Sequence, residues 1–263
     1  MIKFFRKIRH RLLSESKFSK YLLYAIGEIV LVVIGILIAV QINDWNEDRK
    51  VSKANRVHLQ KMVAEMDENI ARMRMLTSDN EGLMYYGFPP LDEAILNCDS
   101  ILKLSYMGLS EEHLPFILNA RFFAGRSVLN LQQDVFEELK STGRLNTLGT
   151  DSLITAIKGY SKRYLREKYY NTEHNDNIIR SMEKLEEGFG KMILDYQRDS
   201  IHFSINKYPW YFDPTSEEYK ILQISFAQVL NSQEKNYGKM MDIEQHSEAL
   251  KRSILNHLNS AEQ

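Results

Sequence analysis

The residues best suited to bind a ligand are four polar positions on one predicted helix: Tyr164, Lys168, Asn171 and Asn175. They follow one another at intervals of four, three and four residues, which places them on one side of an α-helix. The same register is apolar further along the helix, so this part either projects into water or lines a polar cavity. A cavity would orient a small amphipathic molecule. Tyrosines at this spacing are more often half-buried packing residues with solvated hydroxyls, and both interpretations remain open.

Other patterns that support chemistry are missing from the sequence. The seven histidines are scattered, at positions 10, 58, 113, 174, 202, 246 and 257. The nearest grouping with acidic residues, Glu173 to Asp176, lacks ligands at the i+4 spacing that would face one metal ion. The chain also lacks a serine nucleophile elbow, a P-loop and a dinucleotide-binding glycine pattern. We therefore expect no metal, no cofactor and no enzymatic activity.

Residues 21–42 form an apolar run in which Glu28 is the one charged residue. At ~1.5 Å of helical rise per residue the run covers roughly 33 Å, which is enough to cross a hydrocarbon core of ~30 Å. A cleaved signal peptide would have an apolar core of ~7 to 15 residues and would end in a small-x-small cleavage site. The run is longer than that and ends in Ala39-Val40-Gln41-Ile42, so we favour an uncleaved transmembrane helix.

The charge distribution predicts the orientation of this helix. Residues 1–20 contain seven Lys and Arg against one Glu, which predicts a basic amphipathic leader on the cytoplasmic side. A partly ordered basic tail is the alternative interpretation of this stretch. Residues 43–263 contain 27 basic and 33 acidic residues, a net charge of −6, and are expected outside the cytoplasm. An acidic domain also argues against nucleic acid as a partner. The absence of any Asn-x-Ser/Thr acceptor favours a bacterial periplasm.

Within the span, Glu28, Gly27, Gly35 and Ala39 are the predicted contacts with a membrane partner. An ionised carboxylate inside hydrocarbon costs several kcal/mol unless it is protonated, paired or near the interface. Gly35 and Ala39 form a small-x-x-x-small pair that lets two helix backbones approach closely. A second copy or another inner-membrane protein would satisfy both features. Alternatively, Glu28 lies only about two helical turns from the cytoplasmic end and reaches the lipid headgroups there.

Two stretches carry a resemblance to a known family. They are Lys20–Ile29, with the sequence KYLLYAIGEI, and Gln41–Asn46, with the sequence QINDWN. This pattern resembles the N-terminal signature of an uncharacterised family of single-pass inner-membrane proteins from Bacteroidota. Residues Glu138–Gly143 and the tyrosines that follow resemble its external domain less distinctively. The resemblance implies that Glu28 belongs to the family pattern, and it implies no activity.

Residues 43–263 read as helical, because residues 1–88 and 116–208 contain no proline and no sustained two-residue alternation is present. Apolar spacing predicts helices at 59–73 (continuing from the membrane), 91–106, 127–140, 150–198, from 215 and at 234–258. Ser127 is the expected N-cap of one helix, and Thr215 with Glu218 forms the expected capping box of another. The aromatic stretch 199–215 should pack over the bundle or form a contact surface. Cys98, the only cysteine, lies on the packed side of its helix as a structural thiol.

The sequence therefore predicts an all-α protein, with one N-terminal transmembrane helix followed by a periplasmic bundle of long helices. The partners expected are the lipid bilayer and either a second copy or another inner-membrane protein. The leading functional hypothesis is a non-enzymatic scaffold or accessory subunit of a membrane complex. The alternative is a ligand-binding or sensory module that acts through a membrane partner.

Overall fold

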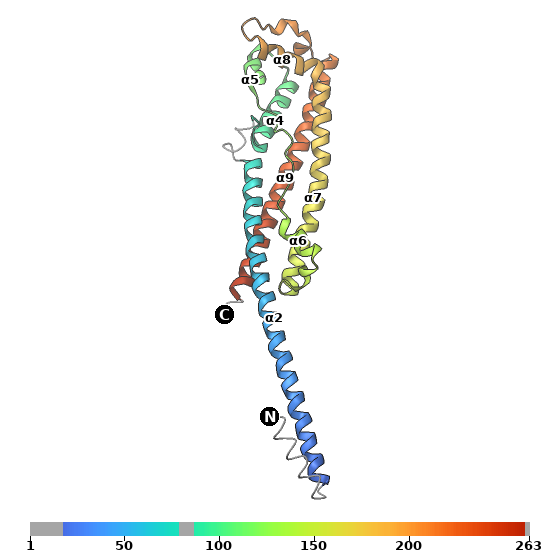
Figure 1. Ribbon diagram of the computed structural model, residues 1–263. Helices are drawn as coiled ribbons and strands as arrows, with labels where there is room; N and C mark the ends of the chain where they lie inside the picture. Colours follow the sequence, from blue (N-terminus) through green and yellow to red (C-terminus); the bar gives the residue numbers. More distant parts are fainter. Residues whose placement is uncertain (1–17, 79–86, 261–263) are drawn as a thin grey trace. The chain divides into compact units, whose positions relative to one another are not determined.

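The computed structural model describes residues 18–78 and 87–260, and these residues are built from helices (Figure 1). They contain α-helices, short 3-10 turns and one π-helical turn but no β-strand, which confirms the all-α fold. The chain forms two compact units, Met1–Val57 and His58–Gln263. Most of the predicted basic leader, residues 1–20, lies outside the described residues.

The first unit contains the predicted span, on helix α2 (Phe18–Thr77). The leucine, isoleucine and valine residues from Leu22 to Ile42 are between 47% and 78% exposed. By length and composition α2 is able to cross a membrane, and it is the one such helix in the part of the chain that the structure describes. Exposed apolar surface of this kind is suited to lipid rather than to water.

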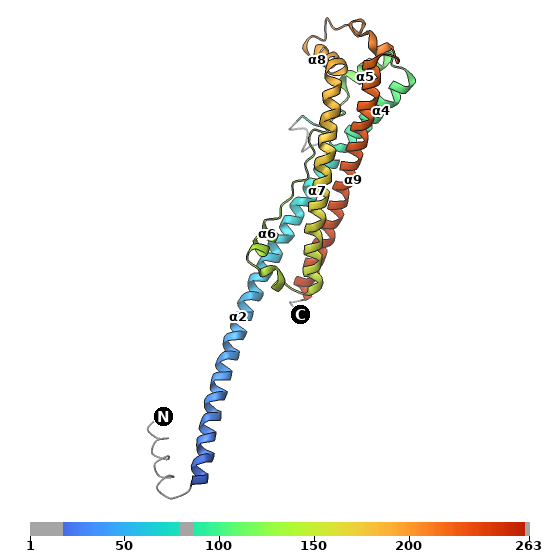
Figure 2. The ribbon, with the colours of Figure 1, turned by 90° about the vertical axis from the view of Figure 1, so that its right-hand side faces the viewer.

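The second unit is organised around two long antiparallel helices, α7 (Asp151–Leu185) and α9 (Glu217–Ser260) (Figures 1 and 2). The residues of α2 from His58 onward pack along one half of this pair, and α4 (Leu91–Met107) packs along the other half. The helices predicted at 59–73 and 91–106 are thus confirmed. Shorter elements connect them, namely α5 (Leu114–Asn119), α6 (Asp134–Ser141) and 3-10 turns at Glu111–His113 and Arg144–Thr147.

The core follows the α7–α9 pair as three apolar clusters, one of which contains Cys98. The Cys98 side chain is fully buried and its thiol lies 3.3 Å from the carbonyl oxygen of Phe226, to which it donates. Burial raises the pKa of this thiol from 9.0 to about 12. The prediction of a structural thiol is therefore confirmed, because a thiol that stays protonated is a poor nucleophile.

The long helix predicted at 150–198 is present with one irregular turn. Thr150 caps α7 by accepting a hydrogen bond from the Leu153 N–H at 3.3 Å. After Leu185 the backbone widens into a π-helical turn at Glu186–Gly190 and continues as α8 (Lys191–Arg198). The pattern of apolar residues carries through this turn, so the sequence indicates one helix where the structure has three segments.

Helix α9 corrects two predictions. The helices expected from 215 and at 234–258 are one continuous helix, Glu217–Ser260. The capping residue is also different from the one predicted, because Ser216 Oγ accepts from the Tyr219 N–H at 3.3 Å. The hydroxyl of Thr215 instead donates to Asp213 Oδ1 at 2.6 Å. The Thr215 capping box is therefore wrong, and the helix begins one residue later.

The helix predicted at 127–140 is also wrong for its first half. Residues 120–133 have no regular secondary structure, and α6 begins only at Asp134. From Ser127 to Gln132 the side chains alternate between buried and exposed, so Leu129 and Leu131 point inward. A helix over 127–140 would turn Val128 toward the core with Leu131 and Val135, but Val128 is 39% exposed. This two-residue alternation is that of an extended backbone, and we call residues 120–133 the extended segment.

The aromatic stretch 199–215 packs over the end of the bundle. It contains two 3-10 turns, Ile205–Lys207 and Pro209–Phe212. Trp210 and Tyr211 are buried, and the Tyr211 hydroxyl donates to the Ser110 carbonyl oxygen at 3.1 Å. Of the two outcomes expected for this stretch, packing over the bundle is the one that the structure shows.

Candidate functional site

The predicted polar positions on α7 surround the extended segment. Tyr164, Asn171 and Asn175 are buried, whereas Lys168 is half-buried with its ammonium 5.6 Å from the centre of the Tyr164 ring. The Tyr164 hydroxyl accepts from the Leu131 N–H at 3.4 Å. The structure therefore brings three of the four residues together. They neither project into water nor line an empty cavity, because they bond to the backbone of the chain itself.

Three side-chain amides, each from a different helix, hold the extended segment by bonding both a backbone N–H and a backbone C=O. The bonds join Gln233 to Phe122 O (3.2 Å) and Ala124 N (3.2 Å), Asn171 to Ser127 O (2.9 Å) and Leu129 N (2.9 Å), and Asn69 to Gln132 O (3.1 Å) and Gln132 N (2.8 Å). The N–H and C=O groups of a buried extended backbone need hydrogen-bond partners, which a neighbouring β-strand usually provides. Here side-chain amides from three helices provide them.

Asn175 and Asn236 complete this network. Asn236 Nδ2 donates to Asn175 Oδ1 at 3.0 Å, and Asn171 Nδ2 lies 3.0 Å from Asn236 Oδ1. Asn175 Nδ2 in turn reaches the Ser127 carbonyl oxygen at 3.4 Å. Binding of a ligand to the predicted residues stays a prediction, and any ligand there would have to replace the extended segment.

The predicted membrane contacts lie on the exposed part of α2. Gly27, Gly35 and Ala39 are exposed and Glu28 is partly exposed. A Cβ atom added at Gly27 or Gly35 would meet no other atom within 4 Å, so the surface is open for another backbone to approach. Partner contact at these residues stays a prediction.

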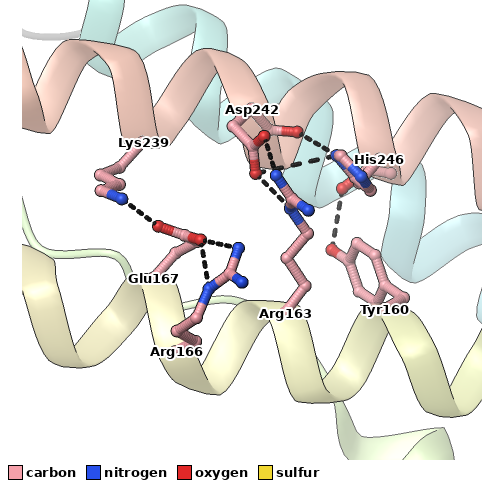
Figure 3. Close-up of polar contacts among 8 residues, drawn as sticks. Tyr160, Arg163, Arg166, Glu167, Lys239, Asp242 and His246 are labelled. Atoms are coloured by element: carbon pink, nitrogen blue, oxygen red, sulfur yellow. Dashed lines mark hydrogen bonds and ion pairs between the residues drawn. The ribbon is translucent and has the colours of Figure 1, made fainter.

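A second polar cluster, which sequence reasoning missed, joins α7 to α9 (Figure 3). Arg163 forms two hydrogen bonds with Asp242, one of them 2.6 Å from Nε to Oδ2. The pKa of Asp242 is lowered chiefly by the hydrogen bond from Arg163. Beside it, His246 Nδ1 lies 2.8 Å from the Asp242 carbonyl oxygen and 3.7 Å from its carboxylate. The pair fixes one guanidinium across the two helices.

Glu167 is the most buried charge of this cluster, with a side chain only 2% exposed. Lys239 Nζ lies 2.6 Å from Glu167 Oε2, and Arg166 donates from Nε to Oε1 at 2.8 Å. Burial raises the pKa of Glu167, but the hydrogen bonds and charges of Lys239 and Arg166 outweigh burial and lower it. Glu167 is therefore a carboxylate held between two cations.

A groove of about 590 Å³ opens next to these ion pairs, between α7 and α9. Small or apolar residues line part of it, among them Gly159, Ala249 and Leu250. The remaining lining includes Tyr160, whose buried hydroxyl lies 2.8 Å from Ser247 Oγ. Burial raises the pKa of Tyr160, so this hydroxyl stays neutral.

The sequence contained part of the signal for this cluster. Arg163, Arg166 and Glu167, and likewise Lys239, Asp242 and His246, recur at spacings that place each set on one side of its helix. Such spacing is also typical of a solvated helix surface. Only the antiparallel register of α7 against α9 shows that the two sets face each other.

The fold thus defines an all-helical protein with one helix long and apolar enough to cross a membrane. A family model described as a family of unknown function, DUF6090, matches residues 28–84. This match agrees with the prediction that the chain resembles an uncharacterised family. No curated protein and no solved structure matches the chain.

Proposed function

We propose that this chain is a single-pass protein of the inner membrane of a Bacteroidota-type bacterium, and that it serves as a non-enzymatic scaffold or accessory subunit. The observation that carries the proposal is the exposed apolar surface of α2 between Leu22 and Ile42. Apolar surface of this extent is unfavourable in water, and a bilayer removes the penalty.

The proposed orientation follows from charge. Seven basic residues within positions 1–20 support a cytoplasmic N-terminus. The unit His58–Gln263 then lies in the periplasm as a helical domain attached to the membrane by α2.

A partner would bind the span through Glu28 and the small residues Gly27, Gly35 and Ala39. The open surface above Gly27 and Gly35 supports this proposal, because small residues let a second helix come close enough for backbone contacts. A polar group from that helix would also relieve the desolvation of the Glu28 carboxylate.

Affinity capture after crosslinking in native membranes tests the proposal. We expect wild-type protein to capture a membrane protein or a second copy, and Glu28→Leu and Gly35→Leu to reduce the yield by about tenfold, which corresponds to ~1.4 kcal/mol of binding free energy. Val33→Leu is the matched control, since it adds bulk on the opposite side of the helix. The proposal fails if the full-length protein is strictly monomeric in mild detergent and no partner is crosslinked.

A further inference from the structure

The seam between α7 and α9 contains two hollows whose charges have one sign. The first is the groove of about 590 Å³, lined by Lys162, Arg163 and Arg166 together with His246. The second, of about 290 Å³, is lined by Arg180 and Lys184 together with polar side chains of α9. Within the described residues, the linings of these two hollows contain five Lys and Arg and no Asp or Glu.

Both hollows open on the same side of α7. Positions 159, 163, 166, 170, 174, 177, 181 and 184 follow one another at steps of three and four residues, which is the repeat of one helix side. The cations are notable because residues 43–263 carry a net charge of −6. Two of the five cations, Arg163 and Arg166, are paired with Asp242 and Glu167. The other three, Lys162, Arg180 and Lys184, add positive charge along this side of α7, which favours the approach of anions.

We infer that the larger groove is a binding site for a small multivalent anion, recognised through its phosphate or carboxylate groups. Arg163 and Arg166 are each held by a carboxylate through Nε and one terminal nitrogen, to Asp242 and Glu167 respectively. Their second terminal nitrogens are not used in these pairs. Two guanidinium groups whose orientation is already fixed lose little conformational freedom when they bind an anion.

Lys162 supplies the charge that the protein itself does not neutralise. It is exposed, and no carboxylate among the described residues pairs with it. Gly159, one turn away, leaves space for the ligand, because a Cβ atom there would meet no other atom within 4 Å. The groove volume falls within the ~300–1,000 Å³ typical of small-molecule sites.

A soluble anion fits this arrangement better than the surface of an anionic membrane. An anionic membrane surface typically binds clusters of about four to eight lysines and arginines. The groove lining has only Lys162, Arg163 and Arg166, and the Arg163 side chain is only 34% exposed. Such a ligand site would add a binding function to the chain. It differs in place from the Tyr164 region predicted from the sequence and does not depend on contacts made by the span.

Isothermal titration calorimetry of the full chain in neutral detergent tests this inference, with tripolyphosphate and citrate as probes at low salt. We expect at least one probe to bind the wild type, and Lys162→Glu to weaken that binding by about tenfold or more. Gly159→Phe should weaken it similarly, because it fills the groove without changing the charge. Lys220→Glu, an exposed change of equal charge outside both hollows, should leave the affinity within about twofold.

Circular dichroism and thermal unfolding of each variant establish that it is folded. The inference is overturned if the wild type binds neither probe, or if Lys162→Glu and Gly159→Phe both bind as the wild type does. It is also overturned if only vesicles that contain phosphatidylglycerol bind, because the basic side would then be a lipid contact. None of these outcomes affects the capture experiment on Glu28.

Discussion

Asn69 forms two side-chain amide hydrogen bonds with one residue, Gln132. Its Nδ2 donates to the Gln132 carbonyl oxygen at 3.1 Å, and its Oδ1 accepts from the Gln132 N–H at 2.8 Å. The Asn69 side chain is 1% exposed although Gln132 is exposed. A buried amide on α2 thus takes the place that a neighbouring strand would take beside the end of the extended segment.

Replacement of Asn69 by alanine should lower the free energy of unfolding of the second unit by about 1–3 kcal/mol, because one donor and one acceptor lose their partner. Asn97→Ala is the control. Asn97 is half-buried and donates a single bond, to the Arg121 carbonyl oxygen at 3.1 Å, so its loss should cost about 0.5–1.5 kcal/mol. Urea unfolding, monitored by circular dichroism, measures the free energy of unfolding of both variants. Equal stability of Asn69→Ala and wild type would contradict this role.

The extended segment also shows where sequence reasoning stopped. Val128, Leu131, Val135 and Leu139 are spaced as in a helix, and α6 does contain the last two. Residues 127–132 are extended because their backbone groups bond to side chains more than 30 positions away, such as Tyr164 and the amides of α2 and α7. No local pattern encodes those bonds, so only the three-dimensional arrangement reveals them.

Helix α9 illustrates the same limit. The sequence predicts two helices, one from 215 and one at 234–258, yet Gln233 and Asn236 are fully buried inside a single helix. They are polar because they bond to the extended segment and to α7. By contrast, the long apolar run of α2 and the apolar sides of α7 and α4 were predictable, since the spacing of apolar residues along the chain indicates them directly.

Asp242→Asn should reduce stability by about 1–2 kcal/mol at neutral pH, since it removes the charge from a pair that is partly screened by solvent. Asp67→Asn is the matched control, because the Asp67–Lys251 pair also joins two helices but Asp67 is 52% exposed. Loss of the Asp67–Lys251 ion pair should lower the free energy of unfolding by about 0–1 kcal/mol. Denaturant unfolding of both variants and the wild type gives the two differences.

The pH dependence of the Asp242 effect has a defined direction. Arg163 lowers the pKa of Asp242 below its ordinary value of 3.8, so the carboxylate stabilises the folded state fully above pH 3.8. That contribution is lost as the pH falls through the lowered pKa of the folded state. The stability difference between wild type and Asp242→Asn should therefore be constant from pH 7 to about 5 and should narrow below pH 3.8. A difference that grows with acid would refute this assignment.

Cys98 should be unreactive in the folded protein. Its pKa of about 12 leaves roughly one thiolate in 10⁴ at pH 8, and its side chain is fully buried. We expect Ellman's reagent to label it only after urea is added, with a rate that follows unfolding of the second unit. Stoichiometric labelling of the native protein within minutes would show that the α4–α9 interface opens readily.

The topology can be tested with single cysteines on either side of the span. Cys98→Ala removes the native thiol, and Asn256→Cys then places one thiol on an exposed position of α9, while Ser14→Cys places one in the leader. If the basic leader is cytoplasmic, a membrane-impermeant maleimide should label Asn256→Cys in intact spheroplasts and Ser14→Cys only after the membrane is permeabilised. The reverse pattern would place the helical unit in the cytoplasm and overturn the proposed orientation, and labelling of both in intact spheroplasts would rule out a single spanning helix.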